Sequence, residues 1–169
     1  MKKMHIIISA ILFAIIPTAA CNRQPQSLKS LFPETIDGLQ RVQLINGIKA
    51  LEEINKLHGK EIGVTDGGIG TYRTDNGSTA MVWISRSKTA DLARNQTEVM
   101  LDRMFSSPHS PFHHPVQREL TGINIHQFQG MGQIHYIFCW YDLVYWISAV
   151  AHQGDTILQA FLPKKKNKD

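Results

Sequence analysis

Histidines are concentrated in one proline-rich stretch, PHSPFHHP at positions 108–115. Its three imidazoles, His109, His113 and His114, are ligands of the type that zinc and copper accept. Their spacing fits no standard ligand pattern, however, and prolines commonly stiffen surface turns. The stretch therefore permits two interpretations, a zinc or copper site and a solvated loop, and the loop is the simpler one.

Cys139 and His135 are a second pair of residue types that can carry chemistry. A four-residue spacing on a strand puts them on one face but about 13 Å apart, because each residue rises about 3.3 Å. A nucleophile and its base must lie within hydrogen-bond reach. We therefore interpret Cys139 as a buried core thiol and keep His126, on a neighbouring predicted strand, as its candidate imidazole partner.

The motifs of common enzyme classes are missing from the sequence. The glycine-rich stretch Gly63–Gly70 lacks the Gly-Lys-Ser/Thr ending of a phosphate-binding loop, and no nucleophile elbow is present. Basic and aromatic residues form no nucleic-acid-binding motif. We predict a non-catalytic protein that has no cofactor and binds no nucleic acid, and we keep an enzyme of unknown class as an alternative.

Aromatic residues cluster late in the chain, where core packing accounts for most of them. Trp140 and Tyr141 are the exceptions, because they fall on a predicted turn. Exposed aromatic side chains commonly mark binding surfaces. We predict that Trp140 and Tyr141 form a binding edge for an envelope protein or an apolar ligand.

Two helices and a hairpin are expected in the first two thirds of the chain. Apolar residues recur every three positions in a helix over 46–57, which we expect to bury Ile48, Leu51, Ile54 and Leu57. Asn76-Gly77 predicts a hairpin with both residues at positive φ, followed by a central strand, Thr79–Ser87. A second helix over 89–105 begins at a cap formed by Ser87 or Thr89.

The last third reads mainly as strands, with a final helix over 155–161. The strands are expected at Val116–Leu120, Ile123–Phe128, Gln133–Cys139 and Leu143–Ala149. The last two are apolar on both faces, which is typical of interior strands covered twice. We predict an α+β fold in which an antiparallel sheet of about five strands carries helices packed on one face.

An export signal precedes these elements. Lys2 and Lys3 are followed by the apolar run Ile6–Ile16, which is too short to span a membrane. The sequence Thr18-Ala19-Ala20-Cys21 resembles the lipobox of bacterial lipoproteins, with Thr18 in place of the usual Leu. The resemblance implies cleavage before Cys21 and lipidation of that cysteine, with palmitate among the acyl groups. Ordinary cleavage after Ala20 is the alternative.

The signal also changes how composition and location are interpreted. Removing residues 1–20 leaves 149 of 169 residues and a formal charge of +2, from 16 Lys and Arg against 14 Asp and Glu. Inner-membrane lipoproteins of some bacteria carry Asp after the lipidated cysteine, so the resemblance, with Asn22 at that position, implies the outer membrane, facing the periplasm. If Cys21 is lipidated, Cys139 has no cysteine with which to form an intramolecular disulfide.

The expected organisation is a signal peptide (1–20), a lipidated tether (21–30), one α+β domain (31–162) and a basic, disordered tail (163–169). The second half of the domain looks like small exported domains of unknown function. We predict a lipid-anchored protein of the cell envelope that acts as a non-catalytic binding or interaction module. A metal-binding or metal-delivery lipoprotein is the alternative.

Overall fold

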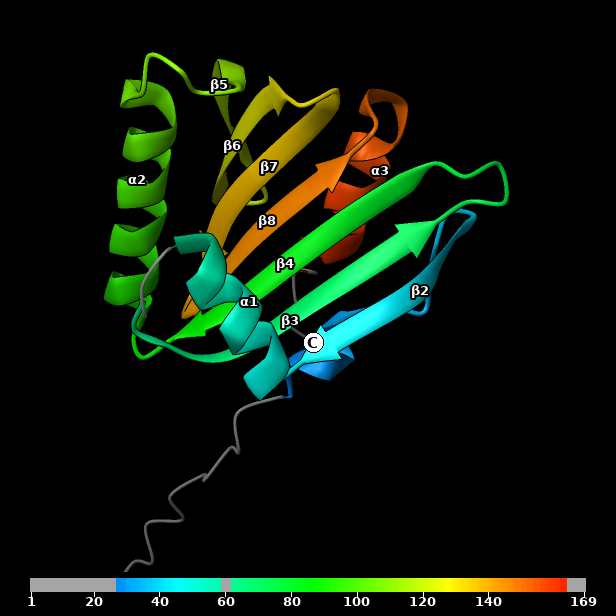
Figure 1. Ribbon diagram of the computed structural model, residues 1–169, viewed down its shortest axis with the longest axis horizontal. Helices are drawn as coiled ribbons and strands as arrows, with labels where there is room; N and C mark the ends of the chain where they lie inside the picture. Colours follow the sequence, from blue (N-terminus) through cyan, green and yellow to red (C-terminus); the bar gives the residue numbers. More distant parts are fainter. Residues whose placement is uncertain (1–26, 59–61, 164–169) are drawn as a thin grey trace, which may run out of the picture.

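The computed structural model describes residues 27–58 and 62–163 (Figure 1). The signal, Cys21 and the lysine-rich tail lie outside the described residues. In chain order the elements are η1 (Leu28–Leu31), β1 (Thr35–Ile36), β2 (Leu39–Asn46), α1 (Ile48–His58), β3 (Val64–Arg73), β4 (Thr79–Ser87), α2 (Ala90–Ser106), β5 (Phe112–Leu120), β6 (Ile123–Gly130), β7 (Gln133–Trp140), β8 (Leu143–Ala149) and α3 (Ala151–Phe161).

All eight described strands join one antiparallel sheet, in the order β1-β2-β3-β4-β8-β7-β6-β5. The predicted mixture of helices and an antiparallel sheet holds, but the prediction of about five strands is wrong. The strands β1 and β2 were missed. In β2 a register shift between Arg41 and Gln43 interrupts the alternation, and Leu39 is its one fully buried residue, so the period-two signal is weak.

The helices cover both faces of the sheet, so the prediction that they pack on one face is also wrong. Figure 1 shows α1 in front of the sheet and α3 behind it. Side chains alternate between the two faces of a strand. On β7, Ile137 packs with Leu101 of α2, whereas its neighbour Tyr136 packs with Ile157 of α3. The interior strands β7 and β8 are therefore covered twice, as their apolar faces predicted.

The larger core lies on the α3 side. Its fully buried side chains include Tyr72, Val82, Phe138 and Ile147 from the sheet and Leu158 from α3. Leu28 of η1 is also buried, so the packed part of the chain begins within the stretch expected to be a tether. All of this core lies between Leu28 and Leu162, so the chain from Asn22 onward contains every described element.

Helix α1 packs against the sheet through Ile54, as predicted, and through Ala50, which was not predicted. Ala50 and Ile54 are buried, whereas Ile48 and Leu57 are 77% and 54% exposed. The helix approaches β3 at Gly67, where an added Cβ would lie 2.7 Å from the Ile54 side chain. The missing side chain at Gly67 therefore sets how closely α1 lies on the sheet, and it leaves Leu57 beside the sheet and open to solvent.

Helix α2 begins where the sequence placed it. Thr89 is the N-cap, and its hydroxyl oxygen accepts a hydrogen bond from the Leu92 amide at 3.2 Å. The strand β4 matches its predicted bounds, Thr79–Ser87. In the preceding hairpin, Gly77 has φ 87° but Asn76 is not at positive φ, which corrects the predicted turn. The Gly77 amide instead donates to the Thr74 carbonyl, closing a wider turn.

The histidine-rich stretch is only partly a loop. His113 and His114 belong to the edge strand β5, at a register shift between His113 and Val116. His114 has φ 55°, the left-handed conformation typical of a bulge. Sequence reasoning missed this strand start because prolines flank it.

Candidate functional site

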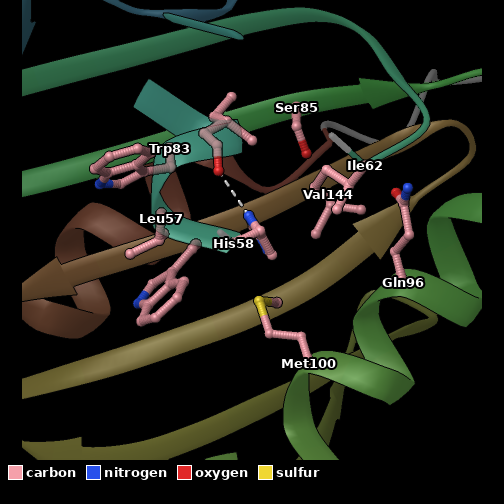
Figure 2. A pocket seen from close by; sticks show the side chains of 10 residues that line it. Leu57, His58, Ile62, Trp83, Ser85, Gln96, Met100 and Val144 are labelled. Carbon is pink, nitrogen blue, oxygen red and sulfur yellow. Dashed lines mark hydrogen bonds between the residues drawn. The ribbon is translucent and has the colours of Figure 1, made fainter. Parts of the chain in front are cut away.

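A groove runs between α1 and α2, over the face of the sheet that these two helices share. Three adjoining hollows make it up, with volumes of about 40, 600 and 330 Å³. Leu57 and Trp146 line all three, so they mark the centre of the groove. We call this surface the α1–α2 groove. Figure 2 shows the smallest hollow, where side chains from both helices and from the sheet point into one space.

The sheet supplies a floor of two indoles. Trp83 of β4 and Trp146 of β8 are direct partners in the strand register, so both lie on the groove face. Ser85 and Val144 continue the floor one pleat further along the same strands. Because β4 and β8 pair only through the folded sheet, residues 63 positions apart in the chain form one surface.

The helices supply the walls. Leu57 and His58 come from the end of α1, and Gln96 and Met100 come from one side of α2. The His58 Nδ1–H donates to the Ile54 carbonyl at 2.8 Å, which holds the imidazole against its own helix (Figure 2). The walls therefore combine apolar side chains, such as Leu57 and Met100, with polar ones, such as His58 and Gln96.

Exposed apolar side chains gather along this groove. In the described part of the chain eight large hydrophobic side chains are exposed, and four of them line it: Leu57, Met81, Val99 and Met131. Single exposed hydrophobics are ordinary, but a contiguous apolar surface commonly marks a binding site. The concentration of these residues distinguishes the groove from the rest of the described surface.

A buried histidine supports the floor. His135 stacks on Phe128 with ring centroids 5.2 Å apart, and its Nε2–H donates to the Gly130 carbonyl at 3.0 Å. Its Nδ1 accepts hydrogen bonds from the Ser148 hydroxyl and the Trp146 indole. Burial lowers the pKa of His135, against the opposing effect of the Gly130 hydrogen bond. The neutral imidazole is therefore a structural support.

The predicted binding edge belongs to a different pocket. Tyr141 is 71% exposed at the β7–β8 turn, and its ring meets Trp140 edge-on at 4.8 Å. Both line a polar hollow of about 550 Å³ beside the start of α2. This hollow and the groove lie on opposite sides of the contact between α2 and the sheet. Trp140 is the half-buried last residue of β7, and both aromatic residues lie away from the apolar groove. Their role as a binding edge stays a prediction.

That polar hollow also brings Cys139 and His126 together, the pair that sequence spacing left open. Burial raises the pKa of the Cys139 thiol against the opposing charge of Arg94, and burial lowers the pKa of the His126 imidazole against the charge of Glu98. Both shifts favour neutral forms. A reactive cysteine needs the opposite, a lowered thiol pKa that favours the thiolate.

The three candidate metal ligands are only partly brought together. The His113 and His114 rings contact each other edge-on, with centroids 4.6 Å apart. Within residues 27–58 and 62–163, no group of three or more His, Cys, Asp or Glu side chains is arranged to hold a metal ion. Zinc or copper binding through His109, His113 and His114 stays a prediction, with two contacting imidazoles as its structural basis.

Sequence reasoning missed the groove itself. The available signal was weak, because Met81 and Trp83 share one face of a strand whose other face, which carries Val82, is also apolar.

No described helix is long and apolar enough to cross a membrane. No family model matches this chain, and no curated protein and no solved structure is significantly similar to it.

Proposed function

We propose that this chain is an exported, lipid-anchored protein of the cell envelope whose domain is a non-catalytic binding module for an apolar ligand. The observation that carries the proposal is the gathering of exposed apolar side chains along the α1–α2 groove, over a floor of Trp83 and Trp146. Ligand sites are typically concave and mostly apolar, with a small number of polar groups that orient the ligand.

The groove is concave and mostly apolar. Polar side chains such as Ser85 and Gln96 also line it, and most of its apolar side chains come from packed strands and helices, with Ile62 and Met131 in the segments between them. A site built on such elements needs little ordering when a ligand arrives, which reduces the entropic cost of binding. The indoles supply large flat surfaces at a low cost in side-chain entropy.

Two observations support the non-catalytic part of the proposal. Cys139 and His126, the nucleophile and base candidates, line the same hollow, and burial favours the neutral thiol and the neutral imidazole. The proposed location is supported by the residues of the signal, Lys2, Lys3, the run Ile6–Ile16 and the lipobox-like sequence ending at Cys21.

The test is binding of a neutral apolar fluorophore, Nile red, to the chain from Asn22 onward. Leu57→Asp places a carboxylate in the groove, whereas Ile48→Asp makes the same change on a part of α1 outside it. Both positions are exposed, so both variants are expected to fold. We expect Leu57→Asp to weaken binding by about tenfold or more, because the carboxylate would be desolvated under the ligand.

The matched variant Ile48→Asp is expected to bind Nile red like the unmodified chain. Equal affinities in all three proteins would show that the dye does not use the groove and would remove the proposal. Circular dichroism and urea unfolding of each variant separate a loss of binding from a loss of fold.

A further inference from the structure

The charge around the α1–α2 groove is one-sided. Among the described residues that line its three hollows there is no aspartate, glutamate or lysine, and Arg103 is the one permanently charged side chain. Arg103 lies in the last turn of α2, beside the largest hollow. An apolar groove with a cation at one edge is complementary to a ligand with an apolar body and an anionic end.

Arg103 has no carboxylate partner in the part of the chain that the structure describes, unlike four other arginines. Those four form ion pairs: Arg41 with Glu34, Arg86 with Asp142, Arg94 with Asp91 and Arg118 with Asp155. The neighbour of Arg103 in sequence, Asp102, accepts a hydrogen bond from Ser106 at 3.1 Å. The guanidinium of Arg103 therefore keeps its donors available to a ligand.

The shape of the groove further limits the class of ligand that it can bind. Its smallest hollow, lined by Ile54 and Val144, measures about 40 Å³, whereas the two hollows beside it measure about 600 and 330 Å³. An unbranched hydrocarbon chain can lie across the two larger hollows and place its end in the small one. Met100 and Met104, with flexible thioether side chains, line the path on the α2 side.

We propose that the ligand of this groove is a long-chain fatty acid, whose hydrocarbon chain lies over Trp83 and Trp146 and whose carboxylate is bound by Arg103. This inference rests on the proposed function, because it names the ligand class of the same groove. The guanidinium fork matches a carboxylate with two parallel hydrogen bonds. This interaction favours a fatty acid over an alcohol with the same hydrocarbon chain.

The experiment compares dodecanoate with dodecanol at neutral pH, with intrinsic tryptophan fluorescence as the readout. Two of the three tryptophans, Trp83 and Trp146, line the groove. The proteins are the chain from Asn22 onward, its Arg103→Met variant and a matched Arg94→Met variant. Arg94 lies on the same helix, outside the groove, and its side chain is 62% exposed.

We expect the unmodified chain and Arg94→Met to bind dodecanoate about fivefold more tightly than dodecanol, as befits an exposed charge contact. Arg103→Met is expected to bind both equally, with its affinity for dodecanol unchanged. High salt is expected to reduce the preference in the unmodified chain, because screening weakens the contact. If Arg103 only stabilises the end of α2, Arg103→Met should keep the same preference for dodecanoate as the unmodified chain.

The outcomes separate the two proposals. If the unmodified chain binds dodecanol as tightly as dodecanoate, and Leu57→Asp weakens both, the fatty-acid inference is overturned and the apolar-ligand function stands. If Arg103→Met keeps the preference for dodecanoate, Arg103 is not the carboxylate site and the inference is overturned. If neither compound binds and Nile red does not bind either, the proposed function fails with it.

Discussion

The indole Nε1–H of Trp146 donates a hydrogen bond to Nδ1 of His135 over 3.2 Å. The same nitrogen lies 2.9 Å from the Ser148 hydroxyl, and the opposite ring nitrogen donates to the Gly130 carbonyl. Protonation of Nδ1 would replace an acceptor with a donor facing the Trp146 N–H. The orientation of one indole in the groove floor therefore depends on a neutral, buried imidazole.

We predict that the protein loses stability as the pH falls below about 6.5, the pKa of an unfolded histidine. Burial lowers the folded-state pKa of His135 below that value, so the unfolded chain takes up the proton first. The stabilisation is complete above the unfolded pKa and is lost as the pH falls toward the folded pKa. Urea unfolding at a series of pH values measures this dependence.

A His135→Leu variant separates this histidine from the others. We expect it to be less stable at neutral pH by about 2 kcal/mol, because the Trp146 indole and the Gly130 carbonyl lose their partners. Its stability should also fall less on acidification than that of the unmodified chain. The same pH dependence in both proteins would contradict the assignment to His135. His126, whose pKa burial also lowers, is expected to account for part of the dependence that remains.

Gly68 of β3, on the face of the sheet away from the α1–α2 groove, is predicted to be essential for packing. A Cβ at Gly68 would lie 2.5 Å from the Phe32 ring, whereas one at Gly63 would meet only a methyl group of Leu92 at 3.1 Å. We expect Gly68→Ala to destabilise the fold by about 1–3 kcal/mol, the usual cost of overpacking. Gly63→Ala is the matched control, with a smaller expected effect in the same denaturant titration.

The N-cap of α2 gives a prediction about the wall of the groove. Thr89→Ala removes the acceptor for the Leu92 amide and should cost about 1 kcal/mol of unfolding free energy. Thr89→Ser keeps the hydroxyl and should retain most of that stability. A threonine whose contribution comes from its methyl group would make Thr89→Ala and Thr89→Ser lose similar amounts of stability, because both variants lack that methyl.

Lipidation is predicted at Cys21, which lies outside the described residues. Radiolabelled palmitate should enter the full-length protein when it is expressed in a bacterial host, and Cys21→Ala should abolish the labelling and release the protein from the membrane fraction. Incorporation that persists in Cys21→Ala would move the acyl group elsewhere. Failure of the unmodified protein to incorporate palmitate would leave ordinary cleavage after Ala20.

Strong local patterns predicted the interior of this fold. Thr79–Ser87 was recognised as a strand with the bounds of β4, and the two apolar faces of β7 and β8 correctly predicted coverage from both sides. That same signal contradicted the prediction of helices on one face. The strands β1 and β2 at one edge of the sheet were not predicted, because β1 has two residues and β2 carries a register shift that hides its alternation of buried and exposed residues.

The groove could not be predicted from sequence, because its parts meet only through long-range pairing. Trp83 and Trp146 become neighbours when β4 pairs with β8, and nothing local in either strand reveals that partnership. Leu57 was predicted to be buried because apolar periodicity identifies one face of a helix. The periodicity does not show how far the sheet extends beneath that face. Tyr141 was recognisable as unusual because a turn leaves it exposed, whereas Trp140 is half-buried at the end of β7, and both line the polar pocket.

The bulge in β5 has a consequence for self-association. β5 is an outer strand of the sheet, and a regular outer strand offers unpaired backbone groups to other copies of the chain. Pro115 lacks an N–H, and the register shift at His113 interrupts the straight run of donors and acceptors. At the opposite border, β1 pairs with Leu39 and Gln40 of β2. The histidine-proline stretch thereby makes the β5 edge a poor template for edge-to-edge pairing with another copy of the chain.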